Sequence, residues 1–130
     1  MAHPQFDEAL APFLAGAQAK VDAYNAQYSH IERSWLEVEK GRRYAKIVLY
    51  SKNRGHEGGR DHTYCFIDMD SGNILKAGGP SGPQDQHPRG NIFAPDHGVS
   101  GVNWFGAVYA DELTPEYRAE MDAHPERGHR

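Results

Sequence analysis

The sequence predicts an α+β fold: an antiparallel sheet of about five strands, built from hairpins and covered by a long N-terminal helix and a short C-terminal helix. Three observations lead to this prediction. Near the N-terminus, apolar residues recur every three or four positions, which is the helical period. From about residue 30 the period changes to two, which is typical of strands. Clusters of Gly, Asn, Asp and Ser then separate the strand-like runs at hairpin spacing.

The N-terminal segment carries one apolar stripe. Its members are Phe6, Leu10, Leu14, Ala17, Val21, Tyr24 and Tyr28. Pro12 has no backbone N–H and is unfavourable inside a helix, so we expect the regular helix to begin near Pro12 and to cover residues 13–29. The stripe could form a coiled-coil seam or pack on a sheet, and the two tyrosines in it favour the sheet.

The first hairpin is predicted between residues 36 and 51. Leu36 and Val38 alternate with glutamates, which is typical of a strand with one buried face. Lys40 and Gly41 form the turn, and the β-rich run of residues 43–51 returns. Residues 52–60 then form a basic, glycine-rich loop.

The second hairpin pairs residues 62–68 with residues 73–77. The turn between them, residues 70–73, has the Asp, Ser, Gly and Asn side chains that turns favour. It is followed by residues 78–91, a loop too rich in Gly and Pro for helix or strand. Structureless loops of this length are usually functional or mobile.

The C-terminal part supplies the last strand and a helix. Residues 103–110 read as a strand. Thr114 and Pro115 then provide an N-cap and a proline at the first helical position. We expect one domain over residues 1–123 and a disordered tail over residues 124–130.

Composition excludes some classes of protein. With 130 residues the chain suits one core, and no apolar run approaches the ~18 residues of a membrane span. The acidic, proline-containing N-terminus is unlike a signal peptide, so we expect a cytoplasmic protein without a membrane partner. Cys65 is the only cysteine, which excludes an internal disulfide.

Positive charge gathers in the middle of the chain. Residues 40–60 contain seven Lys or Arg against one Glu, between two acidic ends. The basic residues are Lys40, Arg42, Arg43, Lys46, Lys52, Arg54 and Arg60. Such a belt suits an anionic partner, although a solvated run of charge has the same appearance. Tyr44 and Tyr50 lie among these cations and could stack bases or pack in the core, as could Tyr64, Trp104 and Tyr109.

The end of the long loop is a second candidate for anion binding. Arg89 offers a planar fork of donors, Gly90 permits close backbone approach, and Asn91 can donate and accept hydrogen bonds. Lys76 could add a charge at the mouth of the loop. Alternatively, Arg89 to Asn91 is a structural turn that leads back into the core.

Catalytic and metal chemistry have less support. The loop histidines, with Asp61, Asp85 and Asp96 near them in sequence, could hold zinc or iron, but no spacing matches a known ligand pattern and we expect no metal or cofactor. These histidines are His56, His62, His87 and His97. Cys65 lies in a strand and is expected to be inert, and Asp68 and Asp70 are expected to cap a turn.

Three motifs in order, "KGRRYAKIV", "YCFIDMDSGNILKA" and "RGNIF", resemble a group of small bacteriophage-encoded accessory proteins. The resemblance spans roughly residues 38–93, and the final strand over residues 103–110 could extend it. Those proteins tend to carry Trp and Lys before the Arg-Gly-Asn segment, where this chain has Gly, Pro and Gln. The resemblance therefore carries over only to Lys46, Lys76, Arg89, Gly90 and Asn91. It implies a phage origin, a place in the host cytoplasm, and a role in host takeover or counter-defence.

Together these features predict a non-enzymatic protein that binds a phosphate-containing partner, either a nucleotide or nucleic acid. Lys40, Arg42, Arg43 and Lys46 would supply charge, and the end of the loop would grip the ligand. One alternative is a structural or interaction protein that oligomerises or docks on a host protein. A metal-dependent hydrolase is a third hypothesis.

Overall fold

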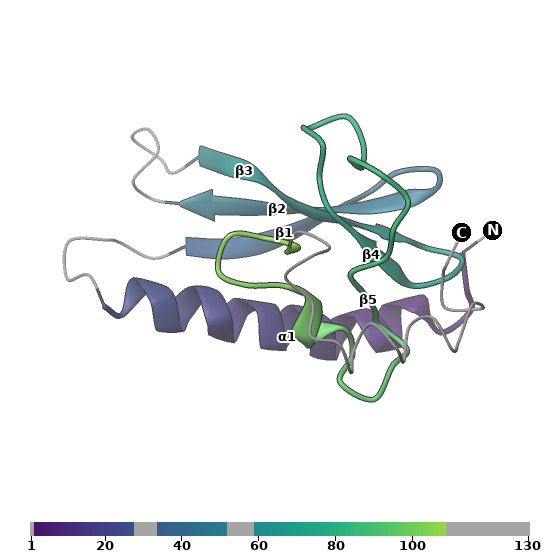
Figure 1. Cartoon of the computed structure of the whole chain (residues 1–130), viewed down its shortest axis with the longest axis horizontal. Helices are drawn as coiled ribbons and strands as arrows, with labels where there is room; N and C mark the ends of the chain where they lie inside the picture. The colour runs from purple at the N-terminus through teal and green to yellow at the C-terminus, as the bar shows by residue number, and fades with distance from the viewer. Residues whose placement is uncertain (1, 28–33, 52–58, 109–130) are drawn as a thin grey trace.

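The computed structural model describes residues 2–27, 34–51 and 59–108, with the side chains of residues 59–61 outside the description. One helix and five strands make up most of the fold: α1 (Phe6–Asn25), β1 (Ser34–Lys40), β2 (Tyr44–Ser51), β3 (Gly59–Asp68), β4 (Asn73–Leu75) and β5 (Gly90–Asn91). The strands form one antiparallel sheet in the order β1-β2-β3-β4-β5, so each strand pairs with the next in sequence. The α+β prediction is confirmed (Figure 1).

Helix α1 lies along one face of the sheet (Figure 1). Its fully buried side chains are Phe6, Leu10, Phe13, Ala17 and Val21, at spacings of three and four. They share one core with Ala45, Ile47, Leu49, Cys65 and Ile67, the side chains of β2 and β3 that point toward the helix. Packing of the stripe on a sheet is therefore confirmed, with Phe13 rather than Leu14 at its centre.

The predicted start of the helix was wrong. Helix α1 begins at Phe6 and contains Pro12 in its interior. Proline removes one backbone hydrogen bond and costs about 3 kcal/mol inside a helix. Phe6 and Leu10 are both buried in the core, so the apolar area that the first turns bury offsets this cost.

The long loop between β4 and β5 covers part of the other face of the sheet (Figure 1). Val48, Phe66 and Leu75 are buried there, away from the helix. Backbone hydrogen bonds order the loop internally, from Gly78 N to Gly82 O (2.9 Å) and from Gln84 N to Lys76 O (2.8 Å). The loop is therefore a folded layer over the sheet.

The fifth strand comes from a different segment than the sequence predicted. Residues 103–108 form a turn and not a strand: the side-chain Oδ1 of Asn103 accepts hydrogen bonds from the backbone N–H groups of Phe105 (2.8 Å) and Gly106 (3.1 Å). Gly106 has a φ of 149°, and a Cβ there would lie 2.3 Å from the Tyr64 carbonyl oxygen. Glycine adopts this conformation readily, whereas a residue of a regular strand would not, so a strand cannot continue through Gly106. The strand at the edge of the sheet is β5 instead.

Several predictions fall on residues outside the described ranges. They concern Tyr28, Tyr109, the helix expected from Thr114 and the tail over residues 124–130. Within the described ranges, α1 is the long helix, and no helix there combines the length and the apolar character that a membrane crossing requires.

Candidate functional site

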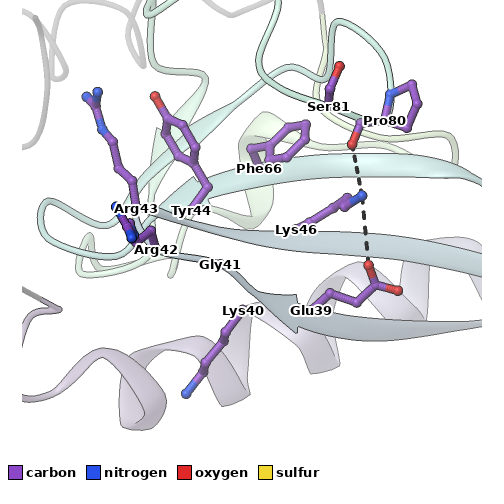
Figure 2. Close-up of a pocket in the computed structure, with 10 residues that line it drawn as sticks. All are labelled: Glu39, Lys40, Gly41, Arg42, Arg43, Tyr44, Lys46, Phe66, Pro80 and Ser81. Atoms are coloured by element: carbon purple, nitrogen blue, oxygen red, sulfur yellow. Dashed lines mark hydrogen bonds and ion pairs between the residues drawn. The ribbon is translucent and has the colours of Figure 1, made fainter.

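The turn between β1 and β2 forms one end of a surface pocket. Lys40 pairs with Ala45 at the last step of the ladder, and Gly41 N donates to Tyr44 O (2.8 Å), which closes the turn over residues 41–43. The pocket has a volume of about 460 Å³ (Figure 2). It is lined by Glu39, Lys40, Gly41, Arg42, Arg43, Tyr44, Lys46, Phe66, Pro80 and Ser81.

Two guanidinium groups lie at the turn. Arg42 is exposed, and among the described residues it has no hydrogen-bond or ion-pair partner. Arg43 donates from Nε to Asp68 Oδ2 (3.1 Å), and its guanidinium lies 5.0 Å from the centre of the Tyr44 ring. The bond to Asp68 raises the pKa of Arg43 above its ordinary value. The Arg43 side chain is 63% exposed, so its Nη donors can reach a ligand.

Lys46 connects two sides of the pocket, β1 and the long loop. Its Nζ donates to the carbonyl oxygen of Pro80 (2.8 Å) in the long loop and lies 3.8 Å from Glu39 Oε1 on β1 (Figure 2). Gln86 supports the same wall, because its Nε2 donates to the Tyr44 hydroxyl (3.0 Å). The loop is thereby fixed over Phe66, and the charge of Lys46 is already partly compensated.

Lys40 belongs to the same turn but points to the opposite side. Figure 2 shows its side chain directed away from Tyr44 and Pro80. Its Nζ contacts Asp7 Oδ1 (2.6 Å) and lies 5.9 Å from the centre of the Phe6 ring, both in α1. Lys40 therefore secures the helix to the sheet, and its ammonium does not face the pocket.

The structure places Arg89 inside the protein, where its side chain is 1% exposed. Its guanidinium donates to Asp85 Oδ1 (2.7 Å), to the His87 carbonyl oxygen (2.5 Å) and to the Val108 carbonyl oxygen (2.8 Å). Its backbone N–H donates to Ile74 O (2.8 Å). These bonds tie the end of the long loop to β4 and to the C-terminal turn. The geometry supports the structural alternative for Arg89 and leaves no guanidinium surface for a ligand.

The neighbours of Arg89 are also engaged in the fold. Asn91 is fully buried, and its Nδ2 donates to Ser71 O (2.7 Å) while its Oδ1 accepts from Phe93 N (2.8 Å). Gly90 is buried in β5 and pairs with Ile74. Lys76 donates from Nζ to the Ala107 carbonyl oxygen (2.9 Å). None of the residues predicted at the loop end lines the pocket.

The part of the long loop that lines the pocket differs from the part that the sequence predicted to bind a ligand. Pro80 and Ser81, near its start, line the pocket, and so does Phe66 in β3. The sequence does contain a signal for Phe66. Side chains alternate along a strand, so Phe66 must lie on the opposite face from its neighbours Cys65 and Ile67. Nothing in the sequence shows that Pro80 would accept a hydrogen bond from Lys46.

The catalytic alternatives gain no support from the described residues. Cys65 is buried, as predicted, and burial raises the pKa of its thiol, which disfavours the reactive thiolate. Asp68 Oδ1 accepts from the backbone N–H groups of Asp70 (2.9 Å) and Ser71 (3.1 Å), which confirms the capping role.

Of the predicted histidines, His62 contacts the Phe105 carbonyl oxygen (2.6 Å) and His97 the Ile92 carbonyl oxygen (3.2 Å). His56 and the side chain of Asp61 lie outside the described residues. In the part of the chain that is described, no three His, Cys, Asp or Glu side chains gather as a metal site requires.

Comparisons with known proteins place the chain in a family. The model of a family of unknown function, DUF7717, matches residues 8–110, which include the whole of the sheet and the pocket. The comparisons with curated proteins and with solved structures give no match. The chain therefore belongs to the family of unknown function DUF7717.

Proposed function

We propose that this protein binds a small phosphate-containing ligand in the pocket at the β1–β2 turn. The observation that carries the proposal is the pair of exposed guanidiniums, Arg42 and Arg43, at the mouth of a pocket of about 460 Å³. Guanidinium forks match phosphate geometry and can donate two parallel hydrogen bonds. Arg42 has no partner within the described part of the chain, so a ligand would not have to displace one there.

The proposal is for a binding protein rather than an enzyme. In the pocket, the groups that could take part in acid–base chemistry are a carboxylate, Glu39, beside Lys46, and the hydroxyls of Tyr44 and Ser81. Glu39 is exposed and lies on the far side of Lys46 from Pro80 (Figure 2). A buried, desolvated general base would be the usual sign of catalysis, and the lining offers none.

We also propose a role in a phage-infected cell, and the sequence resemblance alone supports it. The motif "KGRRYAKIV", on which it partly rests, contains the whole β1–β2 turn and the first residues of β2. A phage protein in the host cytoplasm that binds a phosphorylated metabolite could withdraw it from host processes. The pocket would then be the functional part of the motif.

The test is calorimetric titration of the full chain with ADP and with inorganic pyrophosphate. In the double variant Arg42→Ala/Arg43→Ala, affinity should fall by about 10- to 100-fold, since hydrogen bonds to charged groups contribute about 1.5–3 kcal/mol. Lys40→Ala is the matched control: it removes one positive charge from the same turn but on the helix side. It should change affinity by less than about threefold.

Two results would contradict the proposal. One is that neither probe binds at millimolar concentration. The other is that Lys40→Ala weakens binding as much as Arg42→Ala or Arg43→Ala does when each is made alone, because a general loss of charge, and not the pocket, would then explain the effect.

The alternative, an interaction protein that self-associates or docks on another protein, has one observation in its favour. Trp104 and Phe105 are 40% and 52% exposed, and Trp104 stacks on Tyr24 of α1 at 3.8 Å between ring centres. Exposed aromatic pairs are common at protein interfaces. This alternative predicts a dimer in light scattering at high concentration that Phe105→Ser dissociates, whereas the ligand-binding proposal predicts that Phe105→Ser leaves affinity for ADP unchanged.

A further inference from the structure

The positive region at the pocket is short, because carboxylates lie next to it on β1. Beyond Lys46, the outer face of β1 presents Glu37 and Glu39, both exposed. Trp35 Nε1 donates to Glu37 Oε2 (2.8 Å), and Tyr50 stacks on Trp35 at 5.8 Å between ring centres. A polyanion that ran along this face would meet two negative charges next to the stacked rings of Trp35 and Tyr50.

The other end of the positive region is bounded as well. Asp68 ends β3 and Asp70 lies in the turn that follows, and both interact electrostatically with Arg43. The chain as a whole has a net charge of −4. Among the described residues at the pocket, the field that can attract an anion is therefore concentrated on Arg42 and Arg43, and attraction of a nucleic acid by this part of the surface is weak.

The pocket behind these two arginines has ring surfaces and hydroxyls. Tyr44 and Phe66 contact each other edge to face, with 5.9 Å between ring centres, and Pro80 lies across from them (Figure 2). Ser81 is exposed, and within the described residues its hydroxyl has no partner. Such a lining accepts a flat ring and offers a hydrogen bond to its edge.

We infer that the ligand is a nucleoside mono- or diphosphate and not a single-stranded nucleic acid: its phosphates contact Arg42 and Arg43, and its base contacts Tyr44 and Pro80. The inference rests on the proposed function and narrows it. Two guanidiniums match one or two phosphate groups, and the carboxylates on either side exclude a longer phosphate chain. The ring contacts add affinity that a bare phosphate cannot gain.

The experiment compares four probes by calorimetry: ADP, inorganic pyrophosphate, adenosine and a 20-nucleotide oligo(dT). ADP should bind at least about fivefold more tightly than pyrophosphate, from a stacking contact with the base. Adenosine should bind weakly, because it lacks the phosphates. The oligonucleotide should bind no more tightly than ADP, with a slope of log affinity against log salt no steeper than about −1.5, as two neutralised phosphates give.

A ring variant sharpens the comparison. Tyr44→Leu removes the aromatic surface but leaves both arginines, so the ratio of ADP to pyrophosphate affinity should fall toward 1. Tyr44→Phe keeps the ring and loses only the hydroxyl that Gln86 contacts, so it should preserve the ratio. Circular dichroism and melting temperature show whether each variant is folded.

Each contrary outcome has a distinct meaning. If the oligonucleotide binds more tightly than ADP with a salt slope steeper than about −3, the ligand is nucleic acid and the inference is wrong while the anion site stands. If ADP and pyrophosphate bind equally and Tyr44→Leu has no effect on their ratio, the base makes no contact and the inference is also wrong. If no probe binds, the proposed function itself fails.

Discussion

Two regions of this molecule present arginine beside glycine in a turn, and they differ in what surrounds the guanidinium. At the base of the long loop, Arg89 is surrounded by acceptors: the Asp85 carboxylate and the carbonyl oxygens of His87 and Val108. At the β1–β2 turn, Arg42 has no acceptor within the described residues, and Arg43 has one carboxylate. The same side chain is thus structural in one place and accessible in the other.

The difference shows that the role of an arginine depends on the local supply of acceptors. A loop that folds back on itself leaves backbone carbonyls unpaired, and a buried guanidinium can satisfy several of them. A two-stranded turn has few such carbonyls, because Gly41 N already pairs with Tyr44 O. The arginines of the turn therefore extend into solvent.

The largest effect expected from this comparison is on stability. Arg89→Ala leaves Asp85 and two carbonyl groups without their donor and creates a cavity. The free energy of unfolding should fall by about 2–4 kcal/mol, because the carbonyl oxygens of His87 and Val108 both lose their donor and each unsatisfied group costs about 1–3 kcal/mol. Asp85 is 41% exposed, so water can solvate its carboxylate and the lost ion pair adds little. Urea denaturation followed by circular dichroism measures this. Arg42→Ala serves as the exposed control, and an Arg89→Ala protein as stable as that control would show that the loop base is not a structural anchor.

Asn91→Ala should have the next largest effect. It removes the donor to Ser71 O and the acceptor for Phe93 N in a fully buried position. An unsatisfied buried polar group costs about 1–3 kcal/mol, so unfolding should become easier by about 2 kcal/mol. Asn91→Asp retains the acceptor and reports on the donor separately. A change below about 0.5 kcal/mol in both variants would contradict the role of Asn91 in holding the β3–β4 turn.

A smaller effect is expected on the pH dependence of stability. The hydrogen bond from Arg89 lowers the pKa of Asp85 below its ordinary value. Because the folded pKa is the lower one, the stabilisation is complete above the ordinary pKa of about 3.9 and is lost as pH falls through the folded value. The stability of Asp85→Asn should therefore decline less than that of the wild type as pH falls below about 4. Parallel curves in thermal unfolding would show that the pair contributes nothing to acid sensitivity.

The smallest effect on stability is expected at the β1–β2 turn. Arg42→Ala should change the free energy of unfolding by less than about 0.5 kcal/mol, because the side chain is exposed and unpaired within the described residues. Differential scanning calorimetry beside the wild type measures this. A loss above about 1 kcal/mol would mean that the turn needs Arg42 for its own structure, and the contrast with Arg89 would disappear.

The sequence was sufficient to predict the fold class and the basic turn that lines the candidate pocket. The alternation in β1 and β2 and the stripe of α1 are local patterns, and each one locates an element and its buried face. The basic turn could be predicted for the same reason, because Arg42 and Arg43 are adjacent in the sequence. The burial of the Arg89 side chain could not be predicted, because its acceptors at His87 and Val108 come together only when the loop and the C-terminal turn fold.

The misassigned last strand has a similar cause. The apolar residues 104–109 match a strand by composition, but Asn103 and Gly106 form a turn that depends on a close approach to Tyr64. The predicted start of the helix near Pro12 likewise rested on a local preference, the cost of proline inside a helix. The burial of Phe6 and Leu10 outweighs that cost, so the helix begins at Phe6. In each case a tertiary contact outweighed a local preference.

The central claim is that ligand binding occurs at the β1–β2 turn and not at the end of the long loop. The most direct measurement is a titration of the ¹⁵N-labelled chain with ADP, followed by amide chemical shifts. We expect the largest shifts at residues 41–46 and at Pro80's neighbours Gly79 and Ser81, with little change at Lys76 and residues 89–91. Largest shifts at residues 89–91 would contradict the account, and so would an ADP titration that moves no amide at the turn.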